Sequence, residues 1–200
     1  MGTLDVARPG MNTPWGKADY VNTIIDGIVS VATASHGGLK LSDERQAVVP
    51  SYMQRLAGWY EEDCEWAIPF VVFEKEIMES ADESAKRAIR EGEHKRAFST
   101  WNPVAYERYF GVVLAPGESL IKDEREYLKF HSQDWIVKAA WGDWHGSVPK
   151  GMAGVCASVG CNRSPHAIER YFLVPAEEYR AASRFGFIVD PAKHKEIGKL

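Results

Sequence analysis

The chain lacks long apolar runs, a secretion signal and an excess of basic charge. No apolar run approaches the ~20 residues that a helix needs to cross a bilayer, and the N-terminus lacks the basic-then-apolar pattern of a signal peptide. Lys and Arg number 24 against 28 Asp and Glu, which gives a formal net charge of -4, whereas nucleic-acid binders usually carry a basic face. We therefore expect a cytoplasmic protein without membrane contact, and nucleic acid is the less favoured partner.

The chain also has few cysteines and lacks several common catalytic motifs. Three cysteines in 200 residues argue against a disulfide framework and fit a reducing compartment. The chain contains no GxxxxGK[ST] phosphate loop, no GxGxxG, no GxSxG elbow and no HExxH helix. Hydrolysis of nucleoside triphosphates and the common metalloprotease mechanism are therefore not expected.

The length and composition of the chain are sufficient for one substantial hydrophobic core. A hydrophobic content of 45% in 200 residues favours a single domain over two independent ones. Residues 1–10 carry no periodic apolar pattern, so we expect a disordered extension over residues 1–12. The predicted domain covers residues 13–200 and is of the α+β class, with a mixed or antiparallel sheet of about five strands and several helices packed on it.

Short runs rich in β-branched and aromatic residues supply the predicted strands. The first covers residues 28–33 and runs into a Ser-His-Gly-Gly loop. Four more are separated by Gly, Pro and Asn loops and cover residues 135–141, 152–159, 170–174 and 185–189. A short helix that begins at Pro175 lies between the last two.

Helical patterns dominate the middle of the chain. Residues 61–78 suit a helix with acids in its first turn, but Pro69 must kink or end it; if it ends there, residues 70–73 become a buried strand. Residues 79–96 are charged with one thin apolar face, which predicts a surface helix. Asn102 before Pro103 predicts a capped helix start.

The densest segment runs from Trp59 to Trp66, where two tryptophans, one tyrosine, four acids and one thiol fall within eight residues. Upstream, His36 has glycine neighbours that let a backbone or substrate approach closely. It is suited to be a general base or metal ligand, oriented by a carboxylate. If the chain is an enzyme, its candidate catalytic residues are His36, Cys64, Glu61, Glu62 and Asp63.

Each of these residues also has a structural interpretation. A helix N-terminus lowers the pKa of a thiol such as Cys64, but the flanking acids disfavour the thiolate. Cys64 could equally be a small core residue, His36 a turn histidine, and the acids ordinary first-turn residues.

Aromatic residues define a second group of candidates. Two indoles, an acid and an imidazole fall on a predicted loop at residues 141–146, where exposure would indicate recognition of a partner or planar ligand and burial would indicate core. The candidate binding residues are Trp59, Trp66, Trp141, Asp143, Trp144 and His145.

A metal site is the weaker alternative. Cys156, Cys161 and His166 are separated by four residues each, with His145 as a fourth ligand, but structural zinc knuckles have tighter cysteine spacing. Cys156 could instead point from its strand into the core. We therefore expect no metal and no cofactor, and keep zinc at these residues as the alternative.

Several short motifs, spread from Thr13 to Asp190, together resemble an uncharacterised domain family whose members occur in proteobacterial plasmids, integrated elements and phages. The motifs are Thr13-Pro14-Trp15-Gly16, Ser35-His36-Gly37-Gly38, Trp59-Tyr60-Glu61-Glu62-Asp63-Cys64 with Trp66, Trp141-Gly142-Asp143-Trp144, Val148-Pro149 with Gly151-Met152, and Arg170-Tyr171-Phe172-Leu173-Val174-Pro175. The resemblance implies no assigned activity. What it implies is a genomic context, that of mobile elements. Small accessory proteins of such elements often act on host defence or host processes by binding.

These observations give three hypotheses. The leading one is a mobile-element or phage accessory protein that binds a host or defence-system protein as an anti-defence or host-modulating inhibitor. The second is a small Cys/His or His/carboxylate hydrolase or transferase, and the third is a zinc-stabilised binding module. Enzyme activity stays open, with a non-enzyme favoured, and a homodimer is the default oligomer.

Overall fold

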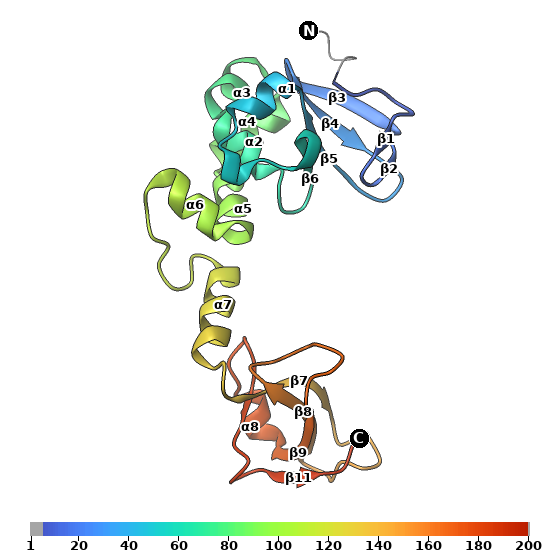
Figure 1. The fold of residues 1–200 in the computed structure, drawn as a ribbon, viewed down its shortest axis with the longest axis vertical. Helices are drawn as coiled ribbons and strands as arrows, with labels where there is room; N and C mark the ends of the chain where they lie inside the picture. The colour runs from blue at the N-terminus through green and yellow to red at the C-terminus, as the bar shows by residue number, and fades with distance from the viewer. Residues whose placement is uncertain (1–5, 200) are drawn as a thin grey trace. The chain divides into compact units, whose positions relative to one another are not determined.

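The computed structural model of the protein, which describes residues 6–199, combines helices with antiparallel sheets (Figure 1). The predicted α+β class is confirmed, and one of the sheets has the expected five strands. The chain forms two compact units, residues 1–121 (unit 1) and residues 122–200 (unit 2). The domain expected over residues 13–200 thus consists of two units, each with its own hydrophobic cluster. Within residues 6–199, no helix has the length and apolar character needed to cross a bilayer.

Unit 1 is built on a four-stranded antiparallel sheet with the strand order β3-β4-β5-β6. Its strands are β3 (Tyr20–Ile25), β4 (Ile28–Ala32), β5 (Gly37–Leu41) and β6 (Trp59–Glu61). The strand predicted at residues 28–33 is confirmed as β4. Because successive side chains of a strand point to opposite faces, Ile28 packs into the main core whereas Val29 and Val31 pack into a smaller cluster.

Helices supply the other side of the main core of unit 1. They are α1 (Asp43–Val48), α2 (Ala67–Val72), α3 (Glu74–Ser80), α4 (Glu83–Arg90), α5 (Glu93–Trp101) and α6 (Pro103–Phe110), with two 3-10 turns, η2 (Ser51–Met53) and η3 (Leu56–Gly58). Helices α1 to α4 lie along one side of the sheet (Figure 1). Phe70, Ile77 and Phe98 are buried there against Leu41 and Tyr60 of the sheet.

The helix predicted over residues 61–78 is wrong in its first third. Residues 59–61 form β6, because they pair with β5 and place Leu39 opposite Tyr60. A turn follows, and Pro69 is the third residue of α2, where a missing backbone N–H leaves no helical bond unmade. The alternative of a buried strand at residues 70–73 is also wrong, because Phe70 and Val71 are buried within α2.

The single surface helix predicted over residues 79–96 is wrong, because this range covers the end of α3, all of α4 and the start of α5. Asp82 begins α4, since its side chain accepts a hydrogen bond from the backbone N–H of Ala85 at 2.9 Å. Gly92, with φ of 68°, separates α4 from α5, a left-handed conformation that glycine adopts without steric cost. An N-cap and a glycine therefore override a continuous helical pattern.

The extension expected over residues 1–12 falls partly outside the described residues, which begin at residue 6. Val6 and Ala7 are buried with Val29 and Val31 on the face of the sheet opposite the main core. The hairpin of β1 (Asn12–Thr13) and β2 (Gly16–Lys17) follows. Residues 6 and 7 therefore belong to the packing of unit 1.

Unit 2 is a five-stranded antiparallel sheet with the strand order β10-β7-β8-β9-β11. Its elements are α7 (Leu120–Phe130, which begins at the end of unit 1), β7 (Trp135–Trp141), β8 (Met152–Val159), β9 (Arg170–Pro175), α8 (Ala176–Arg180), β10 (Ile188–Val189) and β11 (Lys195–Ile197). The strands predicted at residues 135–141, 152–159 and 170–174 are confirmed, as is the short helix after Pro175. Of the strand predicted at residues 185–189, only Ile188 and Val189 form one, β10. Val155, Phe172 and Val174 are fully buried in its cluster.

Candidate functional site

His36 lies in the turn that joins β4 to β5. The backbone N–H and the hydroxyl of Thr33 donate to the His36 carbonyl oxygen at 2.8 and 2.7 Å, and the His36 N–H donates to the Thr33 hydroxyl at 3.2 Å. The turn fixes the backbone, while the imidazole side chain is 57% exposed. His36 therefore presents its ring to solvent from a defined position.

The two glycines after His36 allow a neighbouring strand and turn to come close. A Cβ on Gly37 would lie 2.7 Å from the Glu62 carboxylate, and a Cβ on Gly38 would overlap the Tyr60 carbonyl and the Trp15 ring. The close approach expected at these glycines is thus made by the protein itself. It brings the end of β6 against the His36 turn.

Glu61, the last residue of β6, has a carboxylate that is held by the following turn. Its Oε2 accepts hydrogen bonds from the backbone N–H of Asp63 at 2.8 Å and of Cys64 at 2.9 Å, and from the Cys64 thiol at 3.2 Å. Partial burial acts to raise the pKa of Glu61, but these hydrogen bonds and nearby His36 hold it below its ordinary value. Glu61 is therefore a fixed, ionised acceptor.

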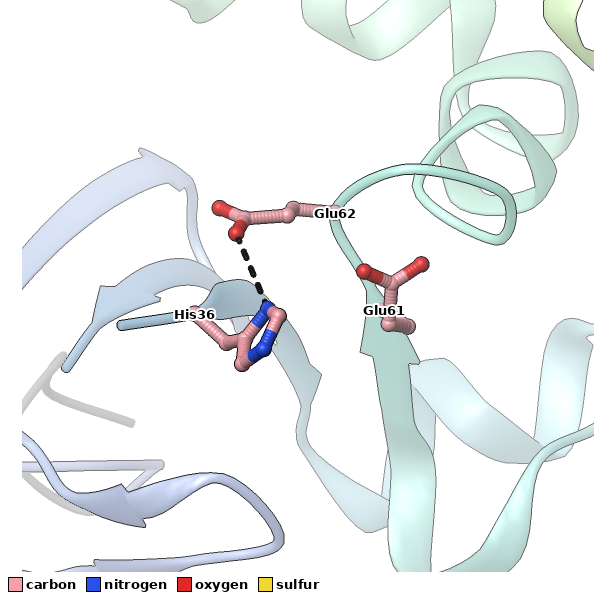
Figure 2. Close-up of side chains that lie close together, drawn as sticks. All are labelled: His36, Glu61 and Glu62. Carbon is pink, nitrogen blue, oxygen red and sulfur yellow. Dashed lines mark ion pairs between the residues drawn. The ribbon is translucent and has the colours of Figure 1, made fainter. Parts of the chain in front are cut away.

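Glu62 completes the group. Its backbone N–H donates to the Gly37 carbonyl at 3.1 Å, and its Oε1 lies 4.0 Å from His36 Nδ1. His36, Glu61 and Glu62 each offer one ligand atom, and these atoms all lie within 4.8 Å of one another. Figure 2 shows the imidazole and the two carboxylates of this group, which we call the His-Glu-Glu group, with a dashed line for the ion pair of His36 and Glu62.

Cys64 and Asp63 border the group. Burial raises the pKa of the Cys64 thiol to about 11, and the hydrogen bond to Glu61 and the charges of Glu61 and Glu65 act in the same direction. The thiol is therefore protonated at neutral pH and serves as a donor, which disfavours it as a nucleophile. Asp63 is exposed and lies outside the His-Glu-Glu group.

A network that the sequence analysis missed holds the turn of residues 61–66. Arg55 pairs through Nε with Glu65 and donates from Nη2 to the Asn102 side-chain oxygen at 2.9 Å. The Asn102 amide then donates to the Cys64 carbonyl at 2.8 Å, and Glu65 Oε2 accepts the Glu61 N–H at 3.2 Å. The Asn102 side chain makes no capping hydrogen bond at the start of α6. The cap expected there is therefore replaced by the hydrogen bonds of Asn102 with Arg55 and with the Cys64 carbonyl.

The tryptophans of the same segment are packed. Trp59 meets Trp15 edge to face at 5.7 Å between ring centroids, and Trp66 meets Phe70 in the same way at 5.0 Å. Trp66, Phe70 and Glu62 line a cavity of about 270 Å³ on unit 1, together with Asn22, Ser30, Val31, Ala32, Gly38 and Leu39. The cavity and the His-Glu-Glu group therefore share the Glu62 side chain.

In unit 2, Trp141 is the last residue of β7. Asp143, Trp144 and His145 lie at the start of the loop that follows it, residues 142–151 between β7 and β8, which we call the tryptophan loop. Asp143 accepts a hydrogen bond from the Gly151 N–H at 3.1 Å, which ties the two ends of the loop. His145 contacts Trp141 and Trp144 with ring centroids 6.5 and 5.9 Å apart. Trp144 is 77% exposed, whereas Trp141 is half-buried.

The tryptophan loop borders a cavity of about 720 Å³. Its lining includes Trp141 and Asp143 together with Tyr179, Glu177 and Arg180 of α8. Sequence reasoning selected the first two from the density of aromatic residues, whereas no local signal links α8 to a loop some 30 residues earlier in the chain. The antiparallel pairing of β8 with β9 brings them together.

The residues considered for zinc do not form a cluster. Cys156 is buried in β8, where burial raises the pKa of its thiol, and Cys161 adopts φ of 57° in the turn after that strand. Within residues 6–199, the His-Glu-Glu group is the one set of three or more His, Cys, Asp or Glu residues whose ligand atoms lie within 4.8 Å of one another. Cys156, Cys161, His166 and His145 are not part of such a set.

Comparison with known proteins gives one family. Residues 8–132 match the model of a domain of unknown function, DUF7007. This region contains His36, Glu61, Glu62 and Cys64, and ends before the tryptophan loop. Neither the curated proteins nor the solved structures contain a significant match to the chain.

Proposed function

The chain belongs to the DUF7007 family of unknown function, and from its geometry we propose that it is a mobile-element accessory protein that binds a host or defence-system protein through the tryptophan loop. The observation that carries this proposal is the exposure of Trp144, which is 77% exposed and follows Gly142 and Asp143, two residues that line a cavity of about 720 Å³. The origin in plasmids or phages rests on the motifs from Thr13 to Asp190.

An exposed indole of this kind is well suited to an interface. Burial of a tryptophan removes on the order of 150–250 Å² from water, which is worth roughly 4–6 kcal/mol at ~25 cal/mol per Å² before the costs of association. Tryptophan and arginine are enriched among the residues that dominate binding energies. Arg180 and Glu177 in the cavity lining supply charged groups that can orient a partner.

Capture of partners from a lysate of the host tests this function. The wild-type chain, Trp144→Ala and Ile168→Ala are immobilised in parallel, and the bound proteins are identified by mass spectrometry. Ile168 is a matched control, because it is an apolar residue of unit 2 that is also 77% exposed. We expect one protein to be retained by the wild type and by Ile168→Ala, and to be lost from Trp144→Ala. Equal retention by all three chains would contradict the proposal.

A second candidate is a small hydrolase or transferase that uses His36 with Glu61 or Glu62. The observation that favours it is the separation of 4.0 Å between His36 Nδ1 and Glu62 Oε1, close enough for a carboxylate to orient the ring after a small side-chain movement. The protonated Cys64 thiol argues against the form that uses cysteine. Turnover of an ester or phosphoester substrate that is lost in His36→Ala would support this candidate, and equal turnover in that variant would exclude it.

A further inference from the structure

The His-Glu-Glu group has the donor set of a cation site. It joins one imidazole nitrogen from the turn before β5 to two carboxylates at the end of β6, all within 4.8 Å (Figure 2). Within residues 6–199, no Lys or Arg forms an ion pair with Glu61 or Glu62, whereas the nearby Glu65 is paired with Arg55. Two neighbouring carboxylates without such a partner favour a bound cation, because a cation between them offsets their mutual repulsion.

The local backbone is shaped for this juxtaposition. A Cβ on Gly37 would meet the Glu62 carboxylate at 2.7 Å, so the glycine leaves the space that the carboxylate uses. Glu61 is oriented by the N–H groups of Asp63 and Cys64 and by the Cys64 thiol. Hydrogen-bonded carboxylates of this kind are typical of metal ligands, whose outer partners fix their orientation.

We propose that His36, Glu61 and Glu62 bind one divalent transition-metal ion, with zinc as its representative. Zinc accepts nitrogen and carboxylate ligands at about 2.0–2.2 Å, which places tetrahedral donor atoms about 3.4 Å apart. Because the ligand atoms lie within 4.8 Å of one another, the group must close by at most about 1.4 Å, through side-chain rotation of His36 and Glu62, which are 57% and 47% exposed. The imidazole nitrogen selects against Mg²⁺ and Ca²⁺, which take oxygen ligands.

Three protein ligands leave at least one coordination position for water or a bound molecule, as in catalytic rather than structural zinc sites. Glu62 also lines the cavity of about 270 Å³, so one of the three proposed ligands lies beside a space for a small molecule. Metal binding at this group does not depend on the tryptophan loop, which belongs to unit 2. It would change the second candidate function from acid–base chemistry by His36 to metal-assisted chemistry.

The test is a titration of the untagged, chelator-treated full chain with ZnCl₂ in an isothermal calorimeter, followed by dialysis and metal analysis. We expect one equivalent of zinc to bind the wild type, and the affinity to fall at least tenfold in both His36→Ala and Glu62→Gln. Asp63→Asn is the matched control, because Asp63 is an exposed carboxylate next to the group but outside it, and it should bind as the wild type does. Far-UV circular dichroism checks that each variant folds.

Zinc at the cysteines is distinguished by a Cys161→Ser/His166→Ala double variant, which should retain full affinity. The proposal is overturned if the wild type binds no zinc, if His36→Ala and Glu62→Gln bind it as tightly as the wild type, or if only the double variant loses it.

Discussion

The Cys64 thiol donates a hydrogen bond to the Glu61 carboxylate, with Sγ 3.2 Å from Oε2. This contact joins two residues for which the sequence suggested different roles, Cys64 as a nucleophile and Glu61 as a carboxylate that orients His36. Because the thiol is the donor, ionisation of Cys64 would both break the bond and place a second negative charge beside Glu61. Cys64 therefore acts as a support for the Glu61 carboxylate.

Cys64 should react slowly with alkylating reagents. With its pKa raised to about 11, the thiolate fraction at pH 8 falls on the order of a hundredfold below that of a free cysteine. The higher nucleophilicity of a more basic thiolate offsets part of this, so we expect labelling to be about tenfold slower. The measurement is the rate of iodoacetamide labelling of Cys64 by mass spectrometry, relative to the same residue in denatured protein.

Glu61→Gln provides the matched comparison for Cys64. Removal of the carboxylate charge should lower the pKa of Cys64 and speed its labelling, although burial, the largest cause of the raised pKa, remains. Labelling of native wild-type Cys64 as fast as in the denatured chain would contradict this account and restore the cysteine form of the hydrolase hypothesis.

Arg55 should be more important to stability than surface arginines and lysines. Its guanidinium joins Glu65, Asn102 and the Met53 carbonyl oxygen, and Arg55 and Glu65 are each 25% exposed. Arg55→Ala leaves the half-buried Glu65 and the Asn102 oxygen without this donor, so we expect a loss of about 1–3 kcal/mol in the free energy of unfolding. Denaturant unfolding measures it.

Lys75→Ala is the control for Arg55, because Lys75 is 89% exposed and lies 4.0 Å from Glu79. An exposed pair of this kind is worth less than about 1 kcal/mol, so the variant should unfold almost as the wild type does. An equal and small effect of both substitutions would mean that the Arg55 network does not stabilise the turn of residues 61–66.

Much of the fold of unit 2 could be predicted from the sequence. Residues 135–141 and 152–159 are rich in β-branched, aromatic and small apolar residues and are bounded by loop residues, and they form β7 and β8. Such local signals suffice where a strand is long and pairs with its neighbour in the chain. The same holds for β4 of unit 1.

The strands that build the candidate site could not be predicted in this way. β5 begins with Gly37 and Gly38, which favour a loop when taken alone, and β6 is only three residues long and overlaps a helical pattern. Their pairing places Gly38 opposite Glu61. Pairing between residues more than 20 positions apart thus forms β5 and β6 and brings His36 close to Glu61. The spacing of these residues in the sequence does not predict this pairing.

Gly38 should tolerate no side chain. A Cβ at this position would overlap the Tyr60 carbonyl and the Trp15 ring, and a backbone carbonyl within a sheet cannot move aside without disturbing its pairing. We expect Gly38→Ala to destabilise unit 1 by about 1–3 kcal/mol or more, measured by thermal and denaturant unfolding. It should also weaken zinc binding, because β5 positions the His36 turn.

Gly146→Ala is the control for Gly38, since a Cβ at Gly146 meets no atom within 4 Å. It should leave the unfolding transition within about 0.5 kcal/mol of the wild type. A stable Gly38→Ala variant that binds zinc normally would show that β5 and β6 are not packed as closely as described.

Asp82 should make unit 1 lose stability as the pH falls into the acid range. Hydrogen bonds from the Ala85 N–H and the Ser84 hydroxyl, at 2.9 Å each, hold the pKa of Asp82 below its ordinary value. A carboxyl group whose pKa is lower in the folded state stabilises the fold above its unfolded pKa of about 4, and this contribution is lost as the pH falls through the folded value. Loss of the cap in Asp82→Ala should cost about 1 kcal/mol at pH 7.

Asp82→Asn separates the cap from its charge. The asparagine oxygen can accept the same bond from Ala85 and is about as good an N-cap residue, so this variant should retain most of the stability at pH 7. Since it has no carboxyl group to protonate, the difference between wild type and Asp82→Asn should shrink as the pH falls from 5 to 2, whereas Asp82→Ala stays less stable at pH 7. Denaturant unfolding at several pH values measures this, and a difference that does not change with pH would mean that the ionised carboxylate adds nothing to the cap of α4.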